Sequence, residues 1–241
     1  GIGDMFGTLL KNPQMLVLFL VFTILYIAQF TYQANYTYYF IYVVGDFTKM
    51  TLATLINAFV GFLAAMVMPK LGAKLGKKMS CVTGFAMMSL ALILVSFFGA
   101  PNGVPNLTAY IIIMSLLMAG TYTWMPYMVV LFLDAGEYFL YKTGKDTRAI
   151  AAGLASPPMK IGMTVGNTLG LALLSAIGFV SGGAFEISVT WITNFMRVTF
   201  MLPGFIYLAA AVIMLLFYKI SDKDAAKYAQ ANAEKMKQDK Q

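Results

Sequence analysis

The sequence predicts an all-α membrane protein with six transmembrane helices. Of its 241 residues, 60% are hydrophobic and only 11% are charged, whereas a soluble domain carries about 25% charged residues. Six long apolar runs follow one another, each near the length of about 20 residues that crosses a bilayer. Basic side chains gather in the short loops between the runs, where they orient a membrane protein. The net charge of +7 therefore favours a membrane over nucleic acid as the partner.

The residue types exclude several kinds of site. The chain has one cysteine, Cys81, and no histidine. A disulfide framework needs pairs of cysteines, and zinc sites and histidine-based acid–base chemistry need residues that the chain lacks. We therefore expect no metal site, no cofactor and no enzymatic activity.

The first run, residues 15–44, would make a helix of about 45 Å, so it must tilt in or protrude from a hydrocarbon core of about 30 Å.

Residues 1–14 form a lead-in, and residues 221–241 form a polar, solvated helical tail. Pro157 and Pro158 interrupt the fifth run. The five later runs cover residues 51–68, 79–98, 107–133, 149–180 and 193–220.

Lysine and arginine predict the orientation. Only Lys49 and Arg197 lie on one side of the predicted membrane. Six crossings return the chain to its starting side, and the basic excess predicts that both termini are cytoplasmic in a multi-pass protein of the cell membrane. The basic residues of that side include Lys11, Lys70, Lys74, Lys77, Lys78, Lys142, Lys145, Arg148, Lys219, Lys223, Lys227, Lys235, Lys237 and Lys240.

Lys160 is a charged residue deep inside the fifth run. It lies roughly eleven residues from the start, or about 16 Å along a helix, which is too deep for its amine to reach the interface. Ser156 and Asn167 share its helical face through the spacings i, i+4 and i+11. The six runs contain no acidic residue. We therefore expect these three residues to face a wet substrate cavity, with the partner of Lys160 outside this chain; a structural counter-charge is the alternative.

Three glycines follow Lys160 in the fifth run. Gly162, Gly166 and Gly170 form a small-xxx-small ladder. Such a ladder lets two helix backbones approach closely. We expect a neighbouring helix to pack along it.

Polar and aromatic residues interrupt the first and fourth runs. Gln29 and Gln33 share a face with Tyr26. Amides and phenols offer hydrogen bonds and ring faces that suit a sugar, although such residues also join packed helices. Trp124 lies too deep for an interfacial belt, so we expect it to stack on a sugar.

The loop after the fourth run carries clustered charges. Asp134 and Glu137 are three residues apart at a helix end, so both carboxylates point the same way. With no histidine or metal ligand nearby, an ionic latch is a better interpretation than acid–base catalysis. We expect Asp134, Glu137, Lys142 and Arg148 to form a cytoplasmic gate, and an ordinary solvated loop is the alternative.

Six spans in about 240 residues are half of a twelve-span transporter. Major facilitator folds consist of two six-span halves, and the substrate binds at the midplane between them. The sequence therefore predicts one half of a major facilitator fold.

The loop motif resembles a known family. Residues 134–144 match a pattern of two acids, Tyr, an aromatic residue and Lys-Thr-Gly, and Lys160 follows at the matching spacing. Residues 38–46, 69–78 and 196–203 add similar support. The chain resembles, over essentially its whole length, the C-terminal half of the glycoside–pentoside–hexuronide:cation symporters.

The resemblance implies a sugar or glycoside symporter that works by alternating access and is driven by Na⁺ or H⁺. It implies that Lys160, Ser156 and Trp124 border the sugar cavity, and that Asp134 and Glu137 belong to the inner gate. The cation would bind mainly on the N-terminal six-helix half, which would be the partner of this chain.

Three other interpretations fit the same residues. A half-size transporter could pair with a second copy to rebuild twelve spans. A transporter-derived scaffold would carry nothing. A facilitator-fold carrier of a lipid or an organic anion would use Lys160 to pair with a substrate carboxylate.

Overall fold

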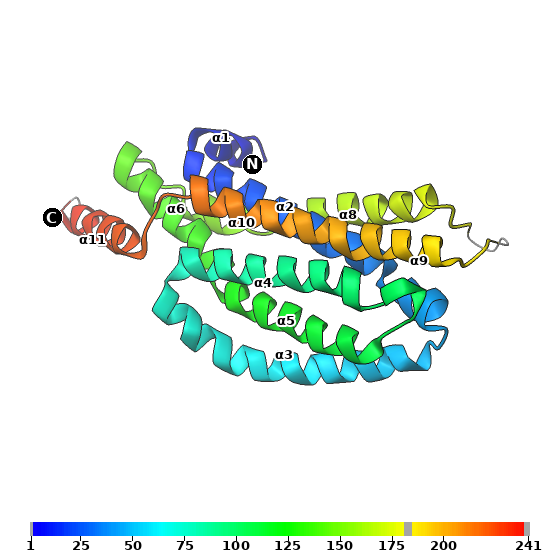
Figure 1. Ribbon diagram of the computed structural model, residues 1–241. Helices are drawn as coiled ribbons and strands as arrows, with labels where there is room; N and C mark the ends of the chain where they lie inside the picture. The colour runs from blue at the N-terminus through cyan, green and yellow to red at the C-terminus, as the bar shows by residue number, and fades with distance from the viewer. Residues whose placement is uncertain (1, 181–184, 239–241) are drawn as a thin grey trace.

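The structure is a computed structural model that describes residues 2–180 and 185–238, and within these residues it is helical and has no β-strand (Figure 1). Single turns of 3-10 or π-helix extend or join several helices. These turns cover Tyr39–Val44, Pro101–Gly103, Met125–Tyr127 and Arg197–Met201. The α-helices are α1 (Ile2–Lys11), α2 (Pro13–Tyr38), α3 (Thr48–Leu75), α4 (Lys77–Phe98), α5 (Leu107–Trp124), α6 (Met128–Thr143), α7 (Arg148–Leu154), α8 (Pro157–Ala176), α9 (Val189–Met196), α10 (Leu202–Phe217) and α11 (Asp222–Gln238).

Five helical stretches in the described residues are long and apolar enough to cross a membrane. They are Pro13–Val44, Thr48–Leu75, Lys77–Phe98, Leu107–Thr143 and Val189–Phe217. They correspond to the first four expected runs and to the sixth. The fourth stretch extends ten residues beyond its apolar run to Thr143, and the sixth begins four residues earlier than its run and stops at Phe217.

The fifth expected run, residues 149–180, is not one continuous helix. It breaks at Ala155 and Ser156 into α7 and α8. Pro157 and Pro158 occupy the first positions of α8 and lack the N–H groups that would extend the hydrogen bonds of α7. The polar residues Lys160 and Asn167 also make α8 less apolar than the five other spans. It nevertheless lies within the bundle, along α2.

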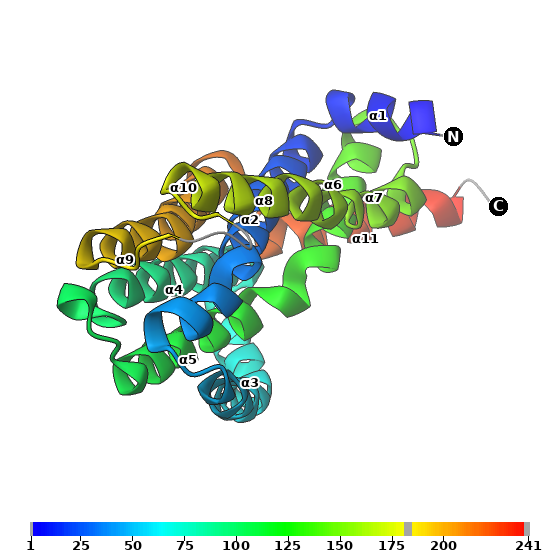
Figure 2. The same cartoon turned by 90° about the vertical axis from the view of Figure 1, so that its right-hand side faces the viewer.

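The long helices run side by side, and α2 lies at the centre of the bundle. It packs against α8 on one side and α10 on another, while α5 packs between α4 and α3 (Figures 1 and 2). Helix α3 lies at the edge. Its buried residues are all small, namely Ala53, Gly61, Ala64 and Gly72, so it contacts the bundle along a narrow strip.

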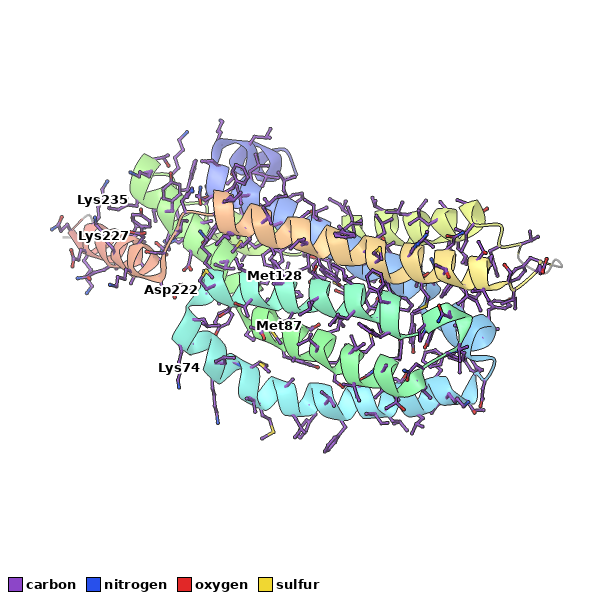
Figure 3. All side chains as sticks on the ribbon, viewed as in Figure 1. Lys74, Met87, Met128, Asp222, Lys227 and Lys235 are labelled. Carbon is purple, nitrogen blue, oxygen red and sulfur yellow. The ribbon has the colours of Figure 1, made fainter. Side chains whose placement is uncertain are left out.

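Both ends of the chain lie at the same end of the bundle, together with α1 and α11 (Figure 1). Lys74, Lys227 and Lys235 lie at that end as well (Figure 3). We call it the basic end. This arrangement agrees with an even number of crossings.

The predicted glycine ladder lies at the contact of α8 with α2. A Cβ atom added to Gly166 would lie 2.7 Å from the carbonyl oxygen of Ile27, and one added to Gly170 would lie 2.7 Å from that of Thr31. Gly162 is packed in the same way against Tyr26. The close approach predicted from the sequence is confirmed.

The two polar ends of the chain are more ordered than expected. The lead-in contains α1, and Asn12 after it caps α2 by accepting from the Met15 N–H and donates to the carbonyl of Ala135 at 2.8 Å. The tail forms α11 as expected, but it is not simply solvated. It packs against α6 and buries Ala225 and Asn232.

Candidate functional site

Lys160 points away from the body of the bundle. Pro158 and Gly162 are buried against the rest of the protein, and Lys160 is two residues from each, about 200° around the helix. Its side chain is exposed. Ser156 is exposed on the same face, and Asn167 is half-buried. The three residues therefore form a polar strip on the outer face of α8.

Lys160 forms no ion pair with any acidic side chain in the described residues. The ion pairs there involve Lys49, Lys77 and Arg148, all near one end of the bundle or the other. The amine is thus available to a group outside this chain.

Trp124 lies inside the bundle, which corrects the expectation of an open stacking face. It is 3% exposed, and its indole N–H donates to the sulfur of Met88 at 3.3 Å. The rings of Phe22, Tyr26 and Phe85 pack around it at centroid distances of 5.7, 6.1 and 5.8 Å. A sugar cannot reach the ring in this arrangement.

Tyr26 belongs to this aromatic cluster. It is half-buried, and its hydroxyl donates to the sulfur of Met128 at 3.5 Å. Gln29 is also half-buried. Neither lines the groove described next.

A groove runs between α2 and α3 and has α5 as its floor. Because α3 packs on α5 and α4, a space of about 460 Å³ separates it from α2. Of the residues expected to bind substrate, only Gln33 lines it. The remaining lining residues are Tyr32, Tyr36, Thr37, Thr54, Asn57, Ala58, Tyr110, Met114 and Met118. We call this space the α2–α3 groove.

Three hydrogen-bonding groups in the groove come from two helices. The hydroxyls of Tyr36 and Thr54 are 3.1 Å apart and share a hydrogen bond. The Oδ1 atom of Asn57 is buried and has no hydrogen-bond partner in the described residues. Thr54 and Asn57 were not predicted as site residues from the sequence. The signal was present, because two polar residues three apart in an apolar span share one face.

Asn35 of the first run joins two packed helices. This was the alternative to cavity lining for the polar residues of that run. It is fully buried, and its Nδ2 atom donates to the carbonyl of Gly170 at 2.7 Å. This bond fastens α2 to the glycine face of α8.

Charged residues converge at the basic end, as the latch prediction requires. Lys77, at the start of α4, pairs with Asp134 and lies 3.8 Å from Asp222. Arg148 pairs with Glu137 at 3.2 Å. Lys77 and Asp222 were not predicted. Both residues are far from Asp134 in the sequence, so no local pattern indicated the contact.

Arg148 also pairs with Asp146 at 2.6 Å. Its hydrogen bonds hold the pKa of the Asp146 carboxyl below its usual range. Lys142 is exposed and forms no ion pair among the described residues, so it does not join the predicted gate in this arrangement.

Helix α11 contacts the same cluster. The Nδ2 atom of Asn232 donates to the Glu137 carboxylate at 2.6 Å and to the Glu137 carbonyl at 3.0 Å. The ring of Tyr228 packs on Tyr138 and Tyr141 of α6, at 5.7 and 4.9 Å. Asp222 begins this helix beside the rest of the basic end (Figure 3).

The chain is similar to known proteins along most of its length. Residues 1–222 match the model of a protein family described as MFS/sugar transport protein. The glucuronide carrier protein homolog of Escherichia coli K12 is 24% identical over 217 residues, which cover 90% of this chain and 46% of the relative.

Two further relatives come from other bacteria. The lactose permease of Lactobacillus delbrueckii subsp. bulgaricus is 26% identical over 219 residues, covering 88% of this chain and 32% of the relative. The raffinose carrier protein of Pediococcus pentosaceus is 23% identical over 218 residues, covering 90% and 32%. The chain spans less than half the length of each of these relatives.

Proposed function

The chain belongs to the MFS/sugar transport protein family, and we propose that it forms the C-terminal half of a cation-coupled sugar or glycoside symporter that works by alternating access. The relatives are named for a glucuronide, lactose and raffinose, so sugars and glycosides are the substrate class to test first. The five apolar spans and the family agree on a multi-pass membrane protein.

The orientation of Lys160 carries this proposal. An exposed amine on the outer face of α8, in its first turn, is costly next to lipid and is stabilised in a wet cavity. A second six-helix half facing this polar strip would supply such a cavity. Its carboxylates would pair with Lys160 and bind the coupling Na⁺ or H⁺, since the apolar runs of this chain contain no acid.

The basic end would serve as the inner gate. The pairs of Lys77 with Asp134 and of Arg148 with Glu137 hold α4, α6 and α7 together. In alternating access one half rocks against the other around a fixed binding site. These pairs would keep this half rigid at the end where the cavity closes.

Transport by the full-length protein tests the proposal. Proteoliposomes would be assayed for uptake of labelled lactose, raffinose and methyl glucuronide under an inward Na⁺ or proton gradient. We expect uptake of at least one of these sugars, and we expect one gradient to stimulate it. If folded protein takes up none of them, the assignment to sugars is wrong.

A carrier of organic anions is the second candidate, because Lys160 has no acidic partner among the described residues. On that reading the substrate carboxylate pairs with Lys160. Uptake of labelled organic anions by the same proteoliposomes, with no uptake of sugars, would favour it.

A further inference from the structure

We propose that the α2–α3 groove binds the ring of an uncharged glycoside, and that the transporter therefore prefers neutral sugars to hexuronides. The proposal rests on the transport function proposed above and adds the charge class of the substrate and a second contact surface for it. This surface is separate from the polar strip of Lys160, because α8 packs on a different face of α2.

The size and lining of the groove suit a sugar ring. Its volume of about 460 Å³ lies within the range of about 300–1,000 Å³ of small-molecule sites. Tyr36 of α2 brings a half-buried aromatic ring to it, while Tyr32 and Tyr110 line it with buried rings. Ring faces accept the C–H faces of a pyranose, while amides and hydroxyls at the rim meet its hydroxyl groups.

Asn57 provides a hydrogen-bond acceptor at the groove, which favours a ligand that donates a hydrogen bond. The Oδ1 atom of Asn57 is buried and has no partner among the described residues, so this half-buried side chain must rotate toward the groove before a ligand can donate to it. A sugar hydroxyl is such a donor, and a hexuronide keeps its ring hydroxyls, so Asn57 favours any hydroxylated ring and the selection against the acid comes from the neutral lining. Gln33 is exposed at the groove and can both donate and accept.

The groove lacks a counter-charge for an acid. All of its lining residues are neutral. A hexuronide carboxylate placed there would lose water with no cation beside it. Burying an unpaired charge is far more costly than burying a hydroxyl that finds a partner, so the groove selects against the acid.

A matched pair of substrates tests the charge class. Methyl glucoside and methyl glucuronide differ only at C6, as do methyl galactoside and methyl galacturonide. With the full-length protein in proteoliposomes, we expect the neutral member of at least one pair to enter at least about a hundredfold faster at equal concentration. If a uronide enters as fast as its neutral counterpart, the charge assignment is wrong while the transport function stands.

Variants in the groove test the contact surface. We expect Asn57→Ala to raise the apparent KM for the neutral glycoside about tenfold, because a sugar hydroxyl loses its acceptor. Asn194→Ala removes an amide of α9 outside the groove and should leave KM unchanged. If both variants behave alike, the groove does not bind the sugar.

A gain-of-function variant keeps the proposal testable if Asn57→Ala does not fold. Gln33 is exposed, so Gln33→Lys should fold and should place a cation at the groove. We expect it to raise the uptake of the uronide about tenfold relative to the neutral sugar. An unchanged ratio would overturn the groove assignment. Absence of transport for both members of every pair would instead overturn the transport function.

Discussion

Gly162, Gly166 and Gly170 let α8 lie against the backbone of α2, and that contact sets the direction of Lys160. A Cβ added to Gly162 would overlap Tyr26 and lie 2.8 Å from its carbonyl carbon. Because the neighbour there includes backbone, it cannot move aside as a flexible side chain would. The ladder thus fixes one face of α8 inward and leaves the opposite face to the polar residues.

Gly162→Ala should therefore destabilise the fold by about 1–3 kcal/mol, the usual cost of overpacking a well-packed contact. The measurement is the apparent Tm of the purified protein in mild detergent. Gly7→Ala is the control, because an added Cβ at Gly7 meets nothing within 4 Å. Equal Tm values for the two variants would contradict the close contact of α8 with α2.

Thiol labelling tests whether Lys160 faces water. Cys81 is fully buried and should not react, so a reactive cysteine can be added without replacing it, and the unaltered protein gives the background labelling. In proteoliposomes of the full-length protein, a charged thiol reagent should label Lys160→Cys. It should spare Leu208→Cys, which replaces an exposed apolar residue of α10 that would face lipid. Labelling of Leu208→Cys alone would place the outer face of α8 against lipid.

The sequence predicts the surroundings of some side chains better than those of others. The glycine ladder and the face of Lys160 follow from helical periodicity, because the spacing alone decides which side chains share a face. Trp124 shows the limit. Its position in the run predicts its depth, but the direction of its ring depends on Phe22, Phe85 and Met88, which lie in other helices.

Among the elements, α11 adds a contact that no local pattern predicts. Its composition is that of a solvated helix, yet Asn232 binds both the backbone and the carboxylate of Glu137. Glu137 therefore divides its carboxylate between Arg148 and α11. The tail helix is therefore part of the cluster of charged residues at the basic end.

Asn232→Ala should release α11 from α6. The lost hydrogen bonds include one to a charged group, so we expect about a tenfold faster tryptic cleavage at Lys227 and Lys235. Gln230→Ala is the matched control, because Gln230 is exposed on the same helix and its side chain donates a hydrogen bond to Glu234 within that helix. Equal cleavage rates in the two variants would mean that the contact with Glu137 does not hold the tail.

The apolar pattern fails most clearly at the break between α7 and α8. Hydropathy joins residues 149–180 into one run because the average hides two adjacent prolines. Their missing N–H groups end one helix and begin the next. Elsewhere Pro13 begins α2 and Pro69 lies inside α3 without ending it. Pro126 lies in the 3-10 turn between α5 and α6, and Pro203 follows a π-helical turn at the start of α10.

At the scale of the whole molecule, the described surface carries many exposed apolar side chains. Exposed large apolar side chains cover α3 and α10, which lipid or a second half would bury. They include Phe59, Phe62 and Met66 on α3, and Phe205, Leu216 and Phe217 on α10. The polar strip of α8 lies on the same bundle.

The number and order of the spans follow from composition, because the bilayer imposes their length. The α2–α3 groove could not be predicted in the same way. It exists because α3 packs through small residues on α5 rather than on α2, and this depends on how four separate helices fit together.

Sugar counterflow by the full-length protein, with and without Lys160, tests the central claim most directly. Lys160→Ala should lower the counterflow rate about tenfold or more, because a charged hydrogen-bonding group is lost from the cavity. Lys160→Arg should retain more of the rate, and Lys223→Ala, on the exposed face of α11, should retain all of it. Counterflow by Lys160→Ala at the rate of the unaltered protein would contradict the claim that this residue faces the transport cavity.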